Sequence, residues 1–574
     1  MPPSRRVSGL RWILASVLVA AFFVQGLFAS RIKSATFDEP AHVAAGVSYV
    51  TTGEVRANPQ HPPLVKLLAG LALVAAGVRL PVGVETDRML HGEGGESRVG
   101  RSLIAESGVD RVMFWARLPV LLLSTALGLL IFARGRAVVG NVAALAALFL
   151  YVLDPNILAH SYLVTMDVAF AACALLFLAL LWRYLQQPDV KRLWLCGLGL
   201  GVLLAAKYST LILLPVAGIL ALAAVRWPTP STTDVPRAFL RPHKPKADPS
   251  NGSGDRVGGY AAVLWALVGM CLIATVVLQV LYLTPGGLYL YSSGLQRVNA
   301  DHSPGYLVFL AGRLQHNFGG YLAWCYLLKE PIATLVLVAV GLVAVVRSKS
   351  ISALGRLFLL LPTLAIFIVH AGWADDLGIR YIIPALPFTF LIAGVGAVWL
   401  LQDCAKWGRV LAVILGAWLV VGACGTWPDQ MSYFNEAACL GGNESQIGLD
   451  GGSRCGPLWL DDSNVDWGQG LKQLREWMER HAPGRKVNLA YFGTVNPDAY
   501  GVAHATIEYN DLMNEPTPGL YAVSSHYVAR APAAGSDWLR RTKPIAVVGH
   551  AFYIYNIEPA TRPSAAETGV NQLR

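Results

Sequence analysis

Eleven long apolar runs constrain this chain more than any other feature of its sequence. A helix needs about 17–25 mainly apolar residues to cross a bilayer. Charged residues make up only 14% of the 574 residues, whereas an ordinary soluble protein contains about 25%. The sequence therefore predicts an α-helical polytopic membrane protein with about 11 transmembrane helices. The predicted spans are residues 10–30, 117–133, 137–154, 164–182, 193–206, 210–225, 260–283, 331–346, 355–372, 381–401 and 410–426.

Charge is unevenly distributed along the chain, and its distribution predicts two domains. Residues 427–574 contain 12 Lys and Arg and 16 Asp and Glu, whereas residues 1–426 contain 34 and 20. We expect residues 1–426 to form a multi-span membrane domain that includes a first outer loop at 31–116. Residues 427–574 are expected to form a soluble extracytoplasmic α/β domain. In that tail the pattern predicts a helix at 466–481 and strands at 457–461, 486–491, 519–524 and 545–557.

The distribution of Lys and Arg between alternate loops predicts the orientation in the membrane. With a cytoplasmic N-terminus, the inner segments hold 19 basic residues in 73 positions and the outer segments hold 14 in 156. Cytoplasmic loops carry the excess of Lys and Arg in membrane proteins. We therefore expect an integral protein of the plasma (inner) membrane with its N-terminus inside and residues 427–574 outside. The net charge of +10 then reflects topology, and no nucleic-acid partner is expected.

Two polar segments of the first outer loop are candidates for chemistry. They read Phe37-Asp38-Glu39-Pro40 and His61-Pro62-Pro63-Leu64. Adjacent carboxylates beside a membrane are poorly solvated and repel each other, which raises one pKa or favours a bound cation. Such a pair suits a general base or a metal ligand. The alternative is a solvated acidic loop, and a bare Asp-Glu pair does not exclude it.

Three further ionisable residues lie at the predicted outer ends of different spans. Asp167 opens the fourth span, Lys207 interrupts an apolar run and Arg380 begins the tenth span. Ionisable residues at membrane depth are unfavourable and usually mark a pathway or a site, although a single one can also lie at the interface. Together they predict carboxylates opposite cations at the outer face, an arrangement suited to a phosphate-linked sugar donor.

The spacing of these segments resembles the protein O-mannosyltransferase and aminoarabinose-transferase family of the C-type membrane glycosyltransferase superfamily (bacterial phospholipid-carrier-dependent glycosyltransferases, family 39). The resemblance rests on Phe37-Asp38-Glu39-Pro40, His61-Pro62-Pro63-Leu64, Asp167, Lys207-Tyr208, Gly378-Ile379-Arg380-Tyr381-Ile382-Ile383-Pro384, Tyr433-Phe434-Asn435-Glu436 and Asp462-Ser463-Asn464-Val465-Asp466-Trp467-Gly468-Gln469. It implies an inverting transfer of a sugar, mannose or another hexose or pentose, from a polyprenyl-phosphate donor. The acceptor would be a hydroxyl of protein Ser/Thr, a lipid or a glycan at the outer face.

The resemblance also implies catalytic roles for the three carboxylates. Asp38 would be the general base that takes the proton of the acceptor hydroxyl. Glu39 and Asp167 would orient it, bind the acceptor, or help Asp38 to hold a possible divalent metal ion. No cofactor is assigned firmly, because the resemblance does not require a metal.

The same resemblance implies a donor-binding group. Lys207 and Arg380 would neutralise the lipid phosphate as its charge grows, and His61 would shape the loop or contact that phosphate. Further candidate substrate-binding residues are Tyr381, beside Arg380, and Arg313 and His316 in the loop 284–330. That loop could form a flap over the donor head group, but aromatic and basic residues at an interface are also often simple anchors.

Two other classes of protein remain as alternatives, and one covalent feature is open. A secondary transporter or flippase could use the same ionisable residues as an ion path, but its site would lie near the bilayer midplane between internal repeats. In a non-catalytic envelope scaffold the ionisable group would be accidental. Cys439 and Cys455, 16 residues apart in the tail, would form a disulfide only in an oxidising compartment.

Overall fold

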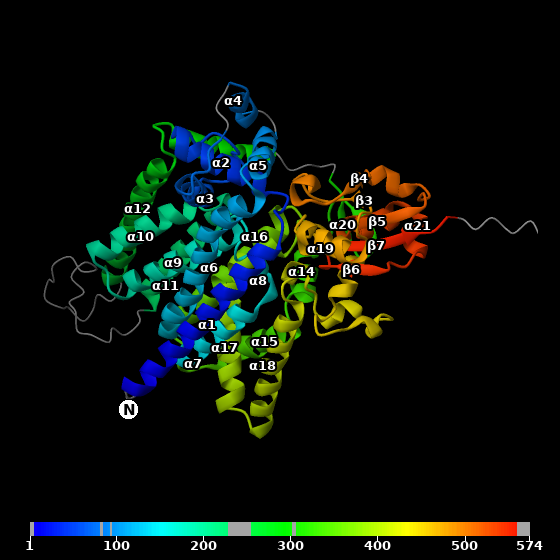
Figure 1. Cartoon of the computed structure of the whole chain (residues 1–574). Coiled ribbons are helices and arrows are strands. Elements are labelled where there is room, and N and C mark those ends of the chain that lie inside the picture. The colour runs from blue at the N-terminus through cyan, green and yellow to red at the C-terminus, as the bar shows by residue number, and fades with distance from the viewer. Residues whose placement is uncertain (1–4, 81–83, 92–93, 228–253, 301–305, 560–574) are drawn as a thin grey trace, which may run out of the picture.

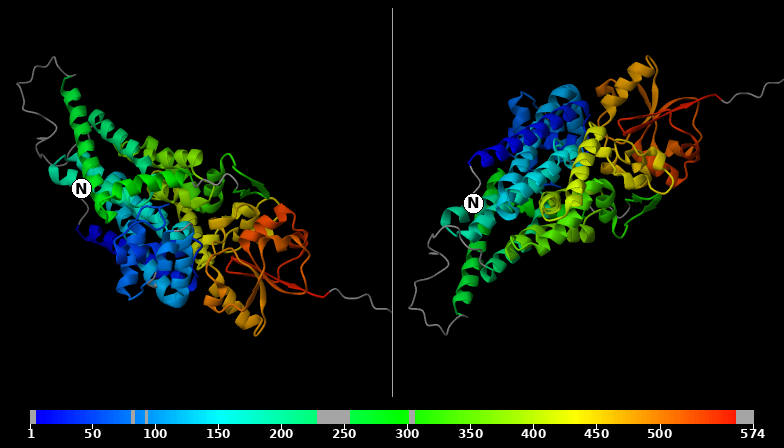
Figure 2. Two further views of the ribbon diagram at one scale, coloured as in Figure 1. Left: turned by 90° about the horizontal axis from the view of Figure 1, so that it is seen from above. Right: turned by 90° about the horizontal axis from the view of Figure 1, so that it is seen from below.

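The structure is a computed structural model that describes residues 5–80, 84–91, 94–227, 254–300 and 306–559. Helices form most of it, and one five-stranded sheet lies in the tail (Figure 1). Both views in Figure 2 place this sheet at one end of the molecule, away from α10 and α12. The helices outside the tail are α1 (Arg5–Ile32), α2 (Glu39–Thr52), α3 (Leu64–Ala75), α4 (Val84–His91), α5 (Gly95–Glu106), α6 (Val109–Val139), α7 (Asn141–Leu153), α8 (Pro155–His160), α9 (Asp167–Gln186), α10 (Val190–Leu204), α11 (Leu213–Arg226), α12 (Gly254–Leu281), α13 (Gly287–Ala300), α14 (Tyr321–Lys329), α15 (Ile332–Arg347), α16 (Ala353–Trp373), α17 (Leu386–Gln402) and α18 (Lys406–Thr426).

Short 3-10 helices connect many of these elements. They are η1 (Tyr208–Ile212), η2 (Ile379–Tyr381), η3 (Ile383–Ala385), η4 (Gln430–Ser432), η5 (Glu436–Cys439), η6 (Glu444–Gln446), η7 (Ser453–Leu458), η8 (Asp462–Asn464), η9 (Pro497–Tyr500) and η10 (Tyr509–Met513). Two of the membrane spans continue through such turns, because η1 leads into α11, and η2 and η3 lead into α17.

Within the described ranges, eight helices are long and apolar enough to cross a membrane, or nine if the bent pair α14 and α15 is one span. The polytopic helical class is therefore confirmed, whereas the predicted number of eleven is not. Two predicted spans form shorter helices: 137–154 contains α7 with 13 residues and 193–206 falls on α10 with 15. Gly140, with φ 85°, separates α6 from α7, and Asp154 caps the next helix.

The predicted first outer loop folds into the helices α2 to α5. Pro63 precedes α3 directly, as expected for a proline pair that fixes the chain at a helix start. Helices α2 and α3 pack backbone against backbone, because a Cβ at Gly46 would lie 2.2 Å from the carbonyl oxygen of Lys66. This close packing holds the first residues of α2, including Glu39, in a fixed position.

The tail contains the sheet, in the strand order β4-β3-β5-β7-β6, with β3 parallel to both β4 and β5. The remaining strand pairs are antiparallel. The predicted α/β character is thus confirmed. The tail elements are α19 (Leu471–His481), β3 (Val487–Ala490), β4 (His504–Thr506), β5 (Gly519–Ser524), α20 (Ser525–Ala534), α21 (Asp537–Arg541), β6 (Ala546–Val548) and β7 (Phe552–Ile557).

Three details of the tail differ from the sequence prediction, and the open covalent feature is present. The helix predicted at 466–481 is shorter, since α19 begins at Leu471. The strand predicted at 457–461 is wrong, because Pro457 lies in the 3-10 helix η7 and the chain then turns away from the sheet. The strand predicted at 545–557 is a hairpin, since Gly549 and His550 adopt positive φ values between β6 and β7. Cys439 and Cys455 form a disulfide.

The tail is hydrogen-bonded to the segment that connects α1 to α2. The backbone N–H of Ser34 donates to the carbonyl oxygen of Gln469 at 3.0 Å, and that of Phe37 donates to Trp467 at 2.8 Å. Lys33 forms an ion pair with Asp429. The residues directly before Asp38 are therefore held by the tail.

Candidate active site

Asp38 and Arg380 form a partly exposed ion pair. Asp38 precedes α2, and its Oδ2 accepts a hydrogen bond from Nη1 of Arg380 at 3.1 Å. The side chain of Asp38 is 30% exposed and that of Arg380 17%. Arg380 lies in the turn η2, which precedes a membrane helix. The pair joins residues 342 positions apart and leaves the carboxylate accessible.

Asp167 and Lys207 form a second, more deeply buried pair. Nζ of Lys207 donates to Oδ1 of Asp167 at 2.6 Å, and the two side chains are 10% and 4% exposed. Asp167 is the first residue of α9, where the free N–H groups of a helix favour a negative charge. Because an unpaired buried charge is strongly destabilising, each partner offsets the burial of the other.

Aromatic rings join the two pairs into one cluster. The centroid of the Tyr381 ring lies 4.8 Å from Nζ of Lys207 and 5.7 Å from the guanidinium carbon of Arg380. The Trp467 ring of the tail lies 4.6 Å from the same guanidinium carbon. Cation–π contacts of this kind hold a cation in place without neutralising its charge. The structure thus brings Asp38, Asp167 and the two cations together around Tyr381.

Glu39 is held differently from its neighbour Asp38. It is fully buried, and Arg117 of α6 donates to both of its carboxylate oxygens, from Nε at 2.9 Å and from Nη2 at 2.7 Å. Thr36 and Val164 supply three more donors. Burial alone would raise the pKa of Glu39, but Arg117 and these donors hold that pKa below its ordinary value. Glu39 is therefore an anion with every acceptor position in use.

Arg117 is a site-shaping residue that the sequence does not single out. Besides Glu39, it donates to the carbonyl oxygens of Ser30, Lys33 and Ser34 at 2.8 to 3.0 Å. It therefore fixes the chain that leads to Asp38. Its signal in the sequence is an arginine at the start of a long apolar run, where a buried charge requires an anionic partner.

His61 lies beside His42, with the ring centroids 5.6 Å apart. Burial, together with the nearby His42, Lys207 and Lys66, holds the pKa of His61 well below its ordinary value. The ring is therefore neutral at pH 7 and offers one donor and one acceptor. Its backbone carbonyl accepts from Nζ of Lys66 at 2.6 Å, which fixes the loop before α3.

The other predicted substrate-binding residues divide into two groups. Tyr381 lies in the cluster, as described above. Arg313 and His316 are exposed on and beside β2 (Arg313–Gln315), which pairs with β1 (Val308–Leu310). Ala311 of this hairpin donates to the carbonyl oxygen of Trp459 at 3.0 Å, so the hairpin packs on the tail. Among the described residues, neither Arg313 nor His316 contacts the cluster.

The tail also fixes the backbone that carries Arg380. Oδ1 of Asn464, in η8, accepts from the backbone N–H of Ile379 at 3.0 Å. Gly378 has φ 113°, and a Cβ there would lie 2.6 Å from the side chain of Asn464. Only glycine allows this approach. The tail motif thus positions Arg380 through Asn464 from one side and Trp467 from another.

The three carboxylates do not suit a metal ion. Asp38, Glu39 and Asp167 are each paired with a different cation, and the lone pairs of Glu39 are already in use. In the part of the chain that the structure describes, no three His, Cys, Asp or Glu side chains gather as a metal site. The predicted metal-ligand set of Asp38, Glu39 and Asp167 therefore has no matching geometry.

Known proteins provide comparisons of two kinds. Residues 108–236 match the family model of dolichyl-phosphate-mannose-protein mannosyltransferase. No curated protein matches the chain in sequence. A solved structure of ArnT from Cupriavidus metallidurans bound to undecaprenyl phosphate is similar, with a TM-score of 0.44 and 12% identity over 96% of this chain and 98% of that chain. So is the apo oligosaccharyltransferase of Archaeoglobus fulgidus, with a TM-score of 0.44 and 12% identity over 93% of this chain and 72% of that one.

The family match covers α6 to α11, the part of the chain that contributes Arg117, Asp167 and Lys207. Of the motifs that carry the resemblance, Asp167 and Lys207-Tyr208 lie within the matched residues, and over residues 108–236 the chain is similar in sequence to this mannosyltransferase family.

Proposed function

We propose that this protein is an inverting glycosyltransferase that moves a sugar from a polyprenyl-phosphate donor to a hydroxyl acceptor. The observation that carries the proposal is the exposed Asp38 carboxylate in contact with Arg380, beside the buried Asp167–Lys207 pair. A base and two fixed cations are the groups that such a transfer requires. The family match at residues 108–236 supports the same reaction class.

Because Asp38 and Arg380 form an ion pair, the donor would bind before Asp38 accepts a proton. The donor phosphate binds Arg380 and Lys207, and because it competes for Arg380, it frees Asp38. Asp38 then takes the proton of the acceptor hydroxyl, whose oxygen attacks the anomeric carbon from the face opposite the phosphate. The bond from that carbon to the phosphate oxygen breaks, and its electron pair leaves with the polyprenyl phosphate. The two cations stabilise the charge that grows on this leaving group.

The remaining residues act through this group. Asp167 holds Lys207 in position through their hydrogen bond, and Glu39, anchored by Arg117, fixes the backbone next to Asp38. His61, neutral at pH 7, is available to hydrogen-bond a donor phosphate oxygen. No step is routed through a metal ion, because Glu39 and Asp167 remain paired with Arg117 and Lys207.

The proposal includes an arrangement in the membrane. Residues 1–426 would form the glycosyltransferase domain, and residues 427–574 an extracytoplasmic domain that supports Arg380. The active site would lie on the outer face, as the Lys and Arg distribution indicates. The donor sugar would be mannose or another hexose or pentose, and the acceptor a protein Ser/Thr, a lipid or a glycan.

The test is product analysis with the purified full-length protein in proteoliposomes. Polyprenyl-phosphate-linked sugars are supplied with candidate acceptors, and both products are identified by mass spectrometry and NMR. The proposal predicts released polyprenyl phosphate and a product of inverted anomeric configuration. Movement of the intact donor across the bilayer, with its glycosidic bond unbroken, would instead indicate a flippase.

A further inference from the structure

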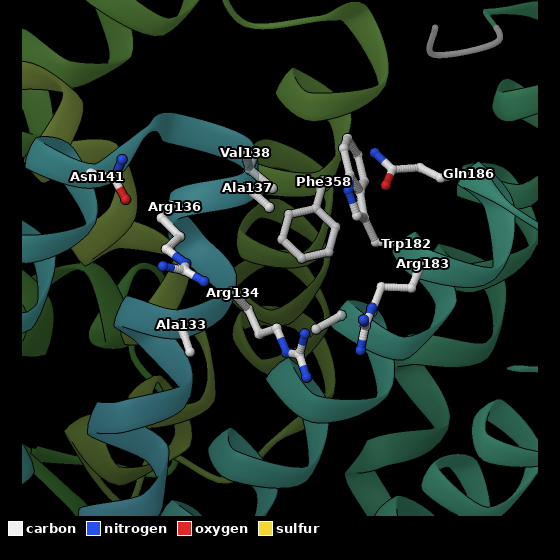
Figure 3. Close-up of a pocket in the computed structure, with 11 residues that line it drawn as sticks. Ala133, Arg134, Arg136, Ala137, Val138, Asn141, Trp182, Arg183, Gln186 and Phe358 are labelled. Atoms are coloured by element: carbon white, nitrogen blue, oxygen red, sulfur yellow. The ribbon is translucent and has the colours of Figure 1, made fainter. Parts of the chain in front are cut away.

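A cavity of about 470 Å³ lies at the opposite ends of the helices that carry the active site. It is lined by the last turns of α6 and α9 and by Phe358 of α16 (Figure 3). Asp167 is the first residue of α9, and Arg183 follows 16 positions later, so the two are separated by about 24 Å along the helix. The cavity is therefore distinct from the candidate active site. The charge count assigns this end to the cytoplasmic side.

Three arginines converge on the cavity. Arg134 and Arg136 come from α6 and Arg183 from α9. Figure 3 shows Arg134 and Arg183 extending toward the same space. In the described ranges none of the three forms an ion pair with a carboxylate, whereas Arg192, nearby in sequence, pairs with Asp189 at 2.6 Å. Three like charges around one hollow repel each other, and a bound anion would remove that repulsion.

A buried hydrogen-bond donor lines the same cavity. Trp182 is only 6% exposed, and its Nε1 has no hydrogen-bond partner. The ring is fixed against Phe358, with the centroids 5.4 Å apart. A buried donor without a partner is destabilising. Nε1 is itself buried at the edge of the cavity, so a bound acceptor oxygen would satisfy it after a small rotation of the indole.

The usual occurrence of basic residues at helix ends explains only part of this cluster of arginines. Basic residues are common at helix C-termini and at cytoplasmic helix ends. Neither tendency requires three of them to face one hollow beside a buried donor. The volume falls within the range of ligand sites, and basic pockets between membrane helices on the cytoplasmic side suit phosphate headgroups. The apolar lining, with Ala133, Ala179 and Phe358, suits the hydrocarbon attached to such a headgroup.

We propose that this cavity binds the phosphate headgroup of an anionic membrane lipid, with Arg134 and Arg183 as the principal cations and Trp182 as a hydrogen-bond donor. Arg136 is the third cation, and its guanidinium carbon is held 4.9 Å from the ring centroid of Trp12 on α1. A bound lipid would therefore connect the inner ends of α6, α9 and α1.

The test is native mass spectrometry of the detergent-purified full-length protein, titrated with phosphatidylglycerol or phosphatidylcholine. The double variant R134Q/R183Q is expected to bind phosphatidylglycerol at least tenfold more weakly, with phosphatidylcholine unchanged. The matched control R347Q/K349Q removes the same charge from two exposed positions, the last residue of α15 and the second residue after it, and is expected to bind as the parent does. W182F keeps the ring, removes the donor and is expected to weaken phosphatidylglycerol binding severalfold.

Two further arms make the result decisive. If the double variant is poorly folded, W182F and the single variant R183Q carry the test, and parent-like phosphatidylglycerol affinity in both would overturn the proposal. Inorganic phosphate at millimolar concentration is expected to displace little lipid, because it lacks the hydrocarbon. Equally strong binding of inorganic phosphate and phosphatidylglycerol would overturn the assignment to a lipid. Equal loss of phosphatidylglycerol in both double variants would show attraction by net charge and would also overturn it.

Discussion

Two neighbouring carboxylates, Asp38 and Glu39, each pair with an arginine, but the two pairs have opposite characters. Glu39 is fully buried and receives five donors, two of them from Arg117. Asp38 is 30% exposed and pairs with Arg380 through one hydrogen bond of 3.1 Å. A saturated buried pair cannot exchange partners without a large loss of stability, whereas a partly exposed pair with one bond can. One step along the chain thus separates an anchor from a group free to react.

The largest effect is expected when the anchor is broken. Arg117→Met leaves the carboxylate of Glu39 buried without its cation, and this is expected to lower the free energy of unfolding by about 3–5 kcal/mol. Thermal unfolding in detergent measures the change. Arg480→Met serves as the control, because Arg480 and Glu476 form an exposed pair of the kind that contributes little. Equal stability of the two variants would contradict the anchoring role.

The pH dependence of stability provides a second way to sharpen the comparison. The pKa of Glu39 is held below its ordinary value of 4.5, so its stabilisation is present above pH 4.5 and is lost as the pH falls through the lowered pKa. As the pH falls, the free energy of unfolding of the parent should decrease by up to about 1.4 kcal/mol per pH unit because of this one proton. Glu39→Gln should be less stable than the parent at neutral pH, and its stability should lack the pH dependence that Glu39 contributes. The exposed control Glu479→Gln should keep that pH dependence. Parallel pH profiles for the parent and Glu39→Gln would contradict the assignment.

The affinity for the polyprenyl-phosphate donor should depend on Arg380 of the partly exposed pair and on Lys207 of the buried pair. Arg380→Met and Lys207→Met each remove a charged contact to the phosphate, which is worth about 1.5–3 kcal/mol. Donor binding should therefore weaken roughly tenfold to a hundredfold, as measured by a titration with polyprenyl phosphate. The exposed Arg313→Met tests whether the loss is specific to the cluster and is expected to bind normally. Retained affinity in both cluster variants would rule out phosphate binding by these cations.

The smallest effect is expected from the tail. Trp467→Leu removes the ring beside Arg380, a contact worth about 1 kcal/mol, so polyprenyl-phosphate affinity should fall roughly fivefold. Trp467→Phe retains an aromatic face and should restore part of that loss. If Trp467→Leu and Trp467→Phe have the same polyprenyl-phosphate affinity, the Trp467 ring acts by packing alone and not by a cation–π contact with Arg380.

The residues that gather around Tyr381 could be singled out from the sequence because each is an unusual residue in its place. Asp167, Lys207 and Arg380 are ionisable groups at the ends of apolar helices, and burial makes such groups conspicuous. Their partners could not be predicted, because pairing depends on which helix ends meet in three dimensions. Arg117 was missed for this reason: it begins an apolar run, and only the fold brings Glu39 to it.

The fold itself was predictable in class and less so in detail. Hydropathy gives the length of an apolar run but not the residue at which a helix within that run begins or ends. For this reason the spans predicted around α7 and α10 are longer than the helices themselves. The apolar residues at 457–461 resemble a strand, yet Pro457 prevents the ladder hydrogen bonding that a central strand needs. Arg313 and His316 were candidates by residue type, and the packing of their hairpin on the tail could not be predicted from the sequence.

The most direct test of the central claim is the transfer rate of Asp38→Asn measured together with its donor affinity. The asparagine cannot accept the proton of the acceptor, so transfer should fall by a factor of about 100 to 10,000. Binding of the polyprenyl-phosphate donor should be retained or tightened, because Arg380 loses its competing carboxylate. Thermal unfolding near that of the parent would confirm that the fold is intact. A variant that transfers sugar at the parent's rate would contradict the account.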